Sequence, residues 1–391
     1  NLAIGLNALS GAVNGGEYNV AIGNYTLDAL TSGDNNVAIG YNALTGNTAG
    51  SNNVAIGFEA LSNPNVGNTV AIGYQALKEL NDTGYQCTAV GYLSLTANTT
   101  GDANTALGRQ TLAANTTGSN NVAIGYGALD APDTEGNNIG IGKDALGGAV
   151  AGGEYNICIG NLVGDHLTSG DSNVAIGYNC FTAAVVGDFN TCVGRDSLAS
   201  VTDADKNVAV GYYAGLSIST GDNNICVGVD SGNTGSPGGN VTTGSNEIYL
   251  GDENISASNI QVDWTVASDK RDKTDVTNLD LGLEFINKLT PVTYRWDKRS
   301  KYIDKSDPSV DLNAVTTDGT HKEDWLDVGF LAQDVAAIEE SYDYKIANKT
   351  NLTTSLSEDG KHYSTKYNKF VPMLVKAVQE LSAQVTTLKD E

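Results

Sequence analysis

The sequence predicts a mainly β protein: a trimeric parallel β-solenoid, or β-roll, shaft of 17-residue repeats, followed by a small α/β C-terminal domain that ends in a coiled-coil helix. Three observations predict this fold class. A motif like Asn-Val-Ala-Ile-Gly recurs through the first two thirds of the chain. All three tryptophans and 17 of the 22 basic residues lie at or after residue 264, which marks a domain boundary near residue 265. The last twenty residues carry apolar side chains at helical spacing.

The repeat is defined by the last glycine of its motif. This glycine returns every 16 to 18 residues, with one final gap of 23, at positions 5, 23, 40, 57, 73, 91, 108, 125, 142, 160, 177, 194, 211, 228 and 251. A fixed period of this length indicates stacked units, each of which forms one coil. At a strand spacing of about 4.8 Å, the 15 coils would extend over roughly 70 Å.

Each motif predicts a short strand with two different faces. The positions three and one before the glycine are mostly β-branched, as in Val20 and Ile22, and their spacing of two puts them on one face. The position between them stays small until the last repeat, so the opposite face must pack against something that leaves no room for a larger side chain. A second short strand is expected after the glycine, as in 41–44. Turn residues such as those of 31–36 close each unit.

Two further features of the repeat bear on assembly. The asparagine four residues before the glycine is expected to stack as an amide ladder along one corner. Because a single 17-residue coil has a thin interior, small and apolar faces are easier to bury when several chains pack around one axis. The repeat therefore favours a homotrimer.

These repeats resemble the head repeats of trimeric autotransporter adhesins, which carry Asn-Ser-Val-Ala-Ile-Gly in a parallel β-roll. The adhesin repeats are usually shorter than the repeat of this chain, so the likeness is to the motif rather than to the whole unit. It covers residues 1 to about 251. The resemblance implies a trimeric, extracellular structure with an adhesive or spacer role.

The cysteines follow the columns of the repeat. Cys158, Cys192 and Cys226 stand at the small position, and Cys180 replaces an alanine after the glycine. Coils two apart are separated by roughly 9.5 Å, beyond the reach of a disulfide, so we expect buried and reduced thiols. The repeated Gly-Asp turns lack the nonapeptide spacing of calcium-binding rolls and are interpreted as turn formers. No metal or cofactor site is predicted.

Charge excludes several classes of partner. A net charge of -24 and a pI near 4.3 argue against nucleic-acid binding and against docking on an anionic membrane. No apolar run is long enough for a membrane-spanning helix, and the first residues show no signal-peptide pattern. The chain opens inside a repeat motif, so we expect the native protein to begin further upstream.

The C-terminal part predicts mixed α/β structure. We expect a helix over 279–289, a strand over 292–296, a second helix that begins near Val335 and a final amphipathic helix over 368–388. Apolar residues at spacings of three and four predict the seam of a short coiled coil at Phe370, Leu374, Ala377, Leu381, Val385 and Leu388.

This part resembles the intramolecular chaperone domain of phage tail fibres and endosialidase tailspikes, a self-cleaving serine peptidase family. Four motifs over about 120 residues, in the order of the family, carry the resemblance. They are Ser268-Asp269-x-Arg271-x-Lys273 with Val276, Leu289-x-Pro291-Val292-x-Tyr294, Gly329-Phe330-Leu331-Ala332-Gln333-Asp334-Val335 and Ala377-Val378-Gln379-Glu380-Leu381.

The resemblance implies a single-turnover autocatalytic serine endopeptidase with a Ser-Lys dyad. Ser268 would attack the carbonyl of Ala267, and a neutral Lys273 would accept the hydroxyl proton. We expect burial and the nearby Arg271, with Asp269 in support, to lower the pKa of Lys273. Because residues five apart point in different directions on a strand or a helix, Ser268 and Lys273 can meet only at a bend or between chains.

The predicted organisation is a repeat shaft over 1–251, a linker and cleavage junction over 252–267, and a chaperone and autoprotease domain over 268–391. The leading hypothesis is a structural virion protein, a tail fibre or appendage used in host attachment. Its partners would be two further copies of itself, an upstream fibre or virion attachment protein, and a host cell-surface receptor, either a glycan or an envelope protein.

Two alternatives stay open. A trimeric adhesin on a bacterial cell surface would also use such repeats. A glycan-degrading tailspike is less favoured, because residues 1–267 contain a single histidine and no evident pair of carboxylates.

Overall fold

The computed structural model describes residues 1–390 except 64, 66, 81–85, 132–133, 149–151, 185, 262–263 and 305–310. The chain divides into two compact units. The first unit comprises Asn1–Asn233 and Val241–Leu250, and the second comprises Thr234–Asn240 and Gly251–Glu391. The long last repeat therefore places seven of its residues in the second unit.

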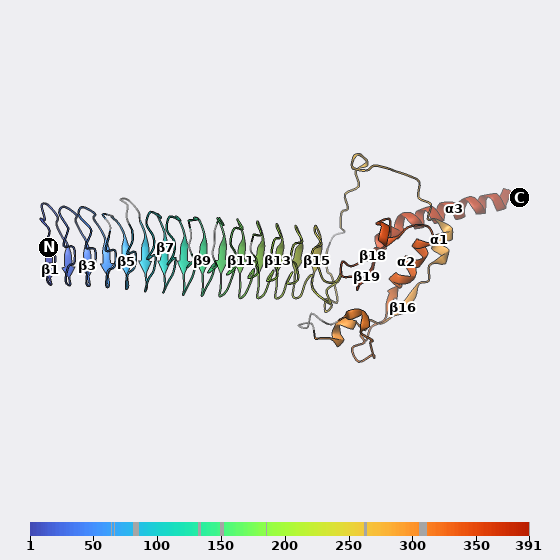
Figure 1. The fold of residues 1–391 in the computed structure, drawn as a ribbon. Helices are drawn as coiled ribbons and strands as arrows, with labels where there is room; N and C mark the ends of the chain where they lie inside the picture. Colours follow the sequence, from blue (N-terminus) through green and yellow to red (C-terminus); the bar gives the residue numbers. More distant parts are fainter. Residues whose placement is uncertain are drawn as a thin grey trace. The chain divides into compact units, whose positions relative to one another are not determined.

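The first unit is a parallel β-solenoid with one three-residue strand per coil (Figure 1). Its strands pair in sequence order, and the register aligns equivalent residues, so that Val20 pairs with Val37 and Val37 with Val54. The predicted solenoid of 17-residue repeats is confirmed. The strands are β1 Leu2–Ile4, β2 Val20–Ile22, β3 Val37–Ile39, β4 Val54–Ile56, β5 Val70–Ile72, β6 Thr88–Val90, β7 Thr105–Leu107, β8 Val122–Ile124, β9 Ile139–Ile141, β10 Ile157–Ile159, β11 Val174–Ile176, β12 Thr191–Val193, β13 Val208–Val210, β14 Ile225–Val227 and β15 Ile248–Leu250.

The small column of the motif forms one wall of the solenoid interior. From β2 to β14, the middle residue of each strand is buried, whereas its two neighbours remain partly or fully exposed. At Gly140 an added Cβ would lie 3.2 Å from the side chain of Leu129 on the opposite wall. This confirms that the small side chains leave space for leucines within the same chain.

The predicted second strand is wrong. In the segment after Gly40, Asn42 and Leu44 have φ of 54° and 55°. The backbone N–H of Asn42 donates to the preceding coil and that of Leu44 to the following coil. Ala43 and Leu44 are adjacent and both fully buried, which a strand does not permit because its neighbouring side chains point to opposite faces. The adjacent Ala-Leu pair of many repeats was the sequence signal against a strand.

The glycine that ends the motif is required by its backbone. Gly23 has φ of +135°, a conformation that side chains rarely adopt. A Cβ on Gly23 would lie 2.4 Å from the carbonyl oxygen of Gly40 on the next coil. The turn from the strand to the next wall therefore fits only glycine at this stacking distance.

The predicted asparagine ladder is confirmed. The side-chain amide of Asn173 donates to Oδ1 of Asn156 at 3.0 Å and to the carbonyl of Gly187 at 2.7 Å. Its own Oδ1 accepts from the backbone N–H of Asn190 at 2.8 Å. The ladder asparagines are buried, and they satisfy corner backbone groups that lie out of reach of water.

All five cysteines are buried and free, as expected. The Sγ atoms of Cys180 and Cys192 lie 2.8 Å apart inside the solenoid. Burial raises the pKa of the Cys87 thiol to about 11 and that of Cys226 to about 12, and it raises the pKa of Cys158 and Cys192 still further above the ordinary value. The thiols therefore act as small apolar side chains.

The second unit is mixed α/β, as predicted. Its elements are α1 Leu283–Lys288, β16 Val292–Tyr294, β17 Asp327–Gly329, α2 Ala332–Glu340, β18 Thr354–Leu356, β19 Tyr363–Thr365 and α3 Phe370–Asp390. β16 pairs with β17 and β18 with β19, both antiparallel. The predicted helix over 279–289 is shorter, because Gly282 stands at the N-terminal boundary of α1 in a non-helical conformation.

The core of the second unit contains Phe285, Val335, Phe370 and Met373. Two carboxylates fasten its elements. Glu380 of α3 accepts the backbone N–H of Leu283 at 2.7 Å and so caps α1, which lowers the pKa of Glu380. The fully buried Glu339 of α2 accepts the backbone N–H of Thr353 at 2.6 Å and its hydroxyl at 2.8 Å.

The predicted coiled-coil seam of α3 is partly wrong. Phe370 and Ala377 are buried against their own domain and are not available to a partner helix. Six of the seven exposed large apolar residues of α3 instead follow a strict heptad spacing, and Val375 is the exception. The six are Val371, Leu374, Val378, Leu381, Val385 and Leu388, with valine and leucine in alternation. We call these six residues the α3 seam.

Candidate functional site

The predicted dyad residues meet in the structure. Lys273 Nζ lies 2.6 Å from Ser268 Oγ. A 3-10 turn over Lys270–Asp272 joins them, and its first N–H groups are capped by Asp269, whose Oδ1 accepts the backbone N–H of Arg271 at 2.8 Å. This turn is the bend that the five-residue spacing requires, and it forms within one chain.

The surroundings of Lys273 differ from the expectation. Ser268 and Lys273 are both exposed in the single chain, so the expected burial of Lys273 is not found there. Arg271 binds Asp269 instead, with guanidinium–carboxylate distances of 2.7 to 3.2 Å. This pairing lowers the pKa of Asp269 and raises that of Arg271. The charge of Arg271 is therefore directed at a carboxylate and not at Lys273.

The predicted scissile bond is accessible. Ala267 and its described neighbours from Trp264 to Ser268 are exposed and lie outside helices and strands. A hydroxyl beside an amine, next to an accessible peptide bond, has the components of a nucleophile and its base. The assignment of Ser268 and Lys273 as catalytic residues stays a prediction.

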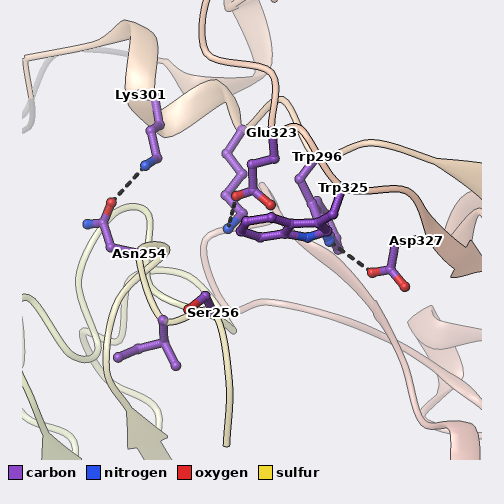
Figure 2. Close-up of a pocket in the computed structure, with 9 residues that line it drawn as sticks. Asn254, Ser256, Trp296, Lys301, Glu323, Trp325 and Asp327 are labelled. Carbon is purple, nitrogen blue, oxygen red and sulfur yellow. Dashed lines mark hydrogen bonds and ion pairs between the residues drawn. The ribbon is translucent and has the colours of Figure 1, made fainter.

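Sequence reasoning missed a pocket in the second unit, of about 310 Å³ (Figure 2). We call it the tryptophan pocket, because the indoles of Trp296 and Trp325 line it together with residues 254–256 and four charged side chains. The charged side chains are Lys298, Lys301, Glu323 and Asp327. The only signal in the sequence was the gathering of all three tryptophans at or after residue 264.

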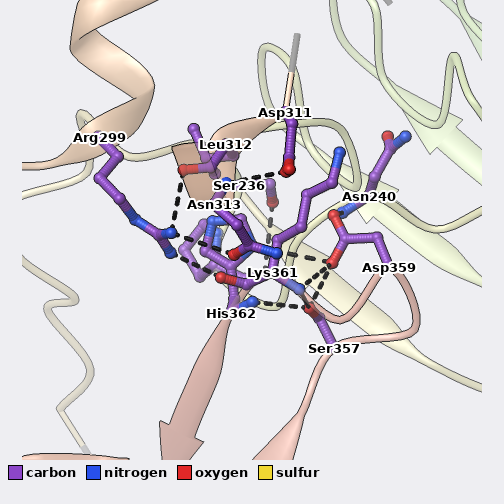
Figure 3. Close-up of polar contacts among 11 residues, drawn as sticks. Ser236, Asn240, Arg299, Asp311, Leu312, Asn313, Ser357, Asp359, Lys361 and His362 are labelled. Carbon is purple, nitrogen blue, oxygen red and sulfur yellow. Dashed lines mark hydrogen bonds and ion pairs between the residues drawn. The ribbon is translucent and has the colours of Figure 1, made fainter. Parts of the chain in front are cut away.

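A polar cluster fastens the turn between β18 and β19 (Figure 3). Arg299 donates to the carbonyl of Lys361 at 2.6 Å and to that of Leu312 at 3.0 Å. Ser357 Oγ contacts Asp359 and accepts the backbone N–H of His362 at 3.0 Å, but it makes no bond to the imidazole. Burial lowers the pKa of His362. This geometry is that of a structural turn, not of a nucleophilic triad.

The part of the chain that the structure describes contains no group of three or more histidine, cysteine, aspartate or glutamate side chains placed to hold a metal ion. None of its helices is both long and apolar enough to cross a membrane.

The C-terminal part of the chain is similar to a known family. The family model described as the chaperone of endosialidase, peptidase S74, matches residues 268–345. The match begins at Ser268, and it covers α1, β16, β17 and α2 but not α3. Searches among curated proteins and among solved structures gave no significant match.

Proposed function

We propose that this chain, whose residues 268–345 form a chaperone-of-endosialidase domain, is the distal part of a trimeric virion fibre, a tail fibre or appendage used in host attachment. The C-terminal domain directs trimerisation and folding, and it releases itself by cutting between Ala267 and Ser268. One observation carries the proposal: a region that matches the chaperone family lies after a long solenoid of nearly interchangeable coils in the same chain.

Such a shaft has a register problem. Moving one chain by one coil along another would exchange one Val-Ala-Ile strand for the next, so the correct register has little energetic advantage over its neighbours. Parallel assembly between chains is also slow. A C-terminal domain that trimerises first would fix both the register and the number of chains, and the coils could then form from that end.

The solenoid has a surface suited to packing against a second copy. The residues three before, one before and one after the motif glycine form what we call the outer stripe, as in Val54, Ile56 and Phe58. Its aromatic members stack from Tyr41 to Tyr92 at centroid distances of 5.2 to 5.4 Å, and each remains at least 40% exposed. The stripe covers about 60 Å² per coil, because its side chains are two residues apart and the strands stack about 4.8 Å apart. Over 15 coils this gives roughly 900 Å², in which the apolar residues are interrupted by polar ones such as Arg109, Lys143 and Arg195.

The area of the outer stripe favours an interface between chains over an ordinary exposed surface. A typical monomer exposes apolar patches of at most about 300–600 Å², whereas a standard interface buries about 800 Å² on each partner. In-register packing of copies around one axis would cover the whole stripe. The α3 seam would bring the C-terminal helices together in the same parallel direction.

The number of chains rests on the solenoid and on the family resemblance. In an isolated parallel coiled coil, valine and leucine alternating as in the α3 seam favour two strands. A mass of three chains in solution would support the trimer. A mass of two chains would indicate a dimer whose number of chains is set by α3. A stable monomer with an intact shaft would contradict the proposal.

Cleavage is proposed as an acyl shift followed by hydrolysis. Ser268 Oγ forms a bond with the carbonyl carbon of Ala267 while the peptide C–N bond breaks, and Lys273 carries the hydroxyl proton to the new amine of Ser268. Water then hydrolyses the ester. Because Lys273 is exposed in one chain, contact with a second chain would be needed to bury it. Cleavage would therefore occur only after the chains have assembled correctly.

The cut is tested by variants within one turn. We expect Ser268→Ala and Lys273→Ala to leave an intact chain, whereas the unmodified protein and the exposed neighbour variant Lys270→Ala should yield a fragment that begins at Ser268. Denaturing gels and N-terminal sequencing measure this. Cleavage that continues in both dyad variants would refute the dyad.

Removal of the domain tests the chaperone role separately. A chain that ends at Ala267 should aggregate, because its coils lack the register signal, whereas Ser268→Ala should remain a soluble trimer that keeps the domain. Soluble yield and sedimentation measure the difference. If the truncated chain formed the same heat-resistant trimer, the domain would be only a processing site.

The repeat motif favours one alternative, a trimeric adhesin on a bacterial cell surface. Labelling with an antibody against the shaft would place the native protein on virions or on cell envelopes. Localisation on virions, and a receptor that is either a glycan or an envelope protein, belong to the leading proposal.

A further inference from the structure

The tryptophan pocket holds two large aromatic rings that are half-exposed, and side-chain contacts hold one of them, Trp296, in place. Trp296 is 44% and Trp325 is 53% exposed. Trp296 donates its indole N–H to Asp327 at 3.3 Å, and Lys298 lies 5.7 Å from the centre of its ring. A half-exposed tryptophan offers a ligand a broad apolar ring face beside a polar N–H group.

The polar side chains of the pocket are also held in position. Lys298 binds Glu323 at 3.0 Å and donates to the carbonyl of Glu253 at 2.6 Å. Lys301 donates to the side chain of Asn254 at 2.7 Å. These contacts hold residues 254–256 opposite the indoles, so the pocket has an aromatic side and a polar rim (Figure 2).

The charges of the pocket balance. Two lysines face two carboxylates, so the lining offers no net charge to select an ion. Each carboxylate can accept about four hydrogen bonds, more than it receives from its protein partners. The pocket therefore suits a neutral ligand with many hydroxyl groups and one apolar face.

We propose that the tryptophan pocket binds a neutral pyranose sugar. The C–H face of a pyranose ring stacks on an indole, and its hydroxyls donate to carboxylates and accept from ammonium groups. The volume of about 310 Å³ lies at the lower end of the range of small-ligand pockets, which suits a single sugar residue with its neighbours in solvent. This site is distinct from Ser268 and Lys273 and adds a binding activity to the domain.

The pocket also spans the proposed cut, and this consequence rests on the proposed function. Residues 254–256 precede Ala267, whereas Trp296 and Trp325 follow Ser268. A bound sugar would contact both future fragments. After cleavage and separation of the fragments, neither should bind the sugar with the affinity of the intact chain.

The experiment uses the full chain carrying Ser268→Ala, so that the pocket stays whole. The methyl pyranosides of glucose, galactose, mannose and N-acetylglucosamine are titrated, with tryptophan fluorescence and calorimetry as readouts. We expect saturable binding of at least one sugar, with a millimolar Kd. Trp325→Ala should weaken it at least tenfold, and Trp325→Tyr should weaken it less. The matched control Trp264→Ala removes a 75% exposed tryptophan outside the lining and should leave the affinity unchanged.

Several results would overturn the sugar site. They are the absence of saturable binding by all four sugars, or equal losses of affinity in Trp325→Ala and Trp264→Ala. Sedimentation of each variant separates this test from the assembly proposal. A change of oligomeric mass in Trp325→Ala without sugar binding would show that a second copy covers the pocket, and it would refute the sugar site while leaving the trimer intact.

Discussion

Replacement of one ladder asparagine tests how the solenoid is held together. Asn173→Ala removes the bonds to Gly187 at 2.7 Å and to the backbone N–H of Asn190 at 2.8 Å. Asn190 keeps its side-chain bond to Ala204, and Asn156 still accepts the backbone N–H at position 173. The variant therefore deprives one buried carbonyl and one buried N–H of their partners.

The expected loss in the free energy of unfolding follows from those two unsatisfied groups. An unsatisfied buried polar group costs about 1–3 kcal/mol, so Asn173→Ala should lower the free energy of unfolding by about 2–6 kcal/mol. Asn173→Thr should cost less, because its hydroxyl can accept the N–H of Asn190, and the chain itself carries threonine in this column at Thr69. Asn161→Ala is an exposed control that removes one bond, to the N–H of Lys143, and should cost about 1 kcal/mol or less.

Urea denaturation followed by far-ultraviolet circular dichroism measures the change. If unfolding is irreversible, the unfolding rate at fixed urea replaces the midpoint, and a factor of ten corresponds to about 1.4 kcal/mol. A loss below about 0.5 kcal/mol for Asn173→Ala, within the range of ordinary surface substitutions, would refute the role assigned to the ladder. So would an equal loss for Asn161→Ala.

Two further predictions concern the coil. Gly142→Ala should prevent stable stacking, because its Cβ would lie 2.2 Å from the carbonyl oxygen of Gly160, whereas Gly147→Ala meets nothing closer than 3.3 Å; soluble yield and melting temperature compare them. The pKa of Cys87 rises from 9.0 to about 11 in the fold, so the unfolded chain loses this proton first and stability should fall as the pH rises from about 9 to 11. Urea midpoints at pH 8 and 10.5 should show a smaller decrease in Cys87→Ala, and equal decreases in both proteins would contradict the raised pKa.

The positions of the coils and their contents were predictable because each coil repeats the same local physics. A small residue between two β-branched residues, an asparagine and a glycine recur at fixed distances, so one correct interpretation applies to every coil. The glycine spacing alone located the strands from β1 to β15. The wall after the glycine was predicted wrongly, because leucine rarely adopts a left-handed backbone conformation. Hydrogen bonds between neighbouring coils stabilise that conformation here.

At the C-terminal site, too, one part was predictable from the sequence and another was not. The sequence placed Ser268 and Lys273 together through a family motif and required a bend between them, and the structure forms that bend with an Asp269 cap. The sequence could not show whether Lys273 is buried or exposed, because that depends on which segments pack around the turn.

The periodic pattern by itself determined that this chain stacks into a parallel solenoid with an apolar interior and a separate mixed α/β end. Only the tertiary structure decided which apolar faces remain outside. It buries Phe370 and Ala377 and exposes Val371 and Val378 on the same helix, because the hydrophobic core of the domain contacts one side of α3. It also brings Trp296 and Trp325 into one pocket across 29 residues of sequence. Local periodicity fixes which residues share a face, whereas the partner of that face is set by contacts between segments far apart in the chain.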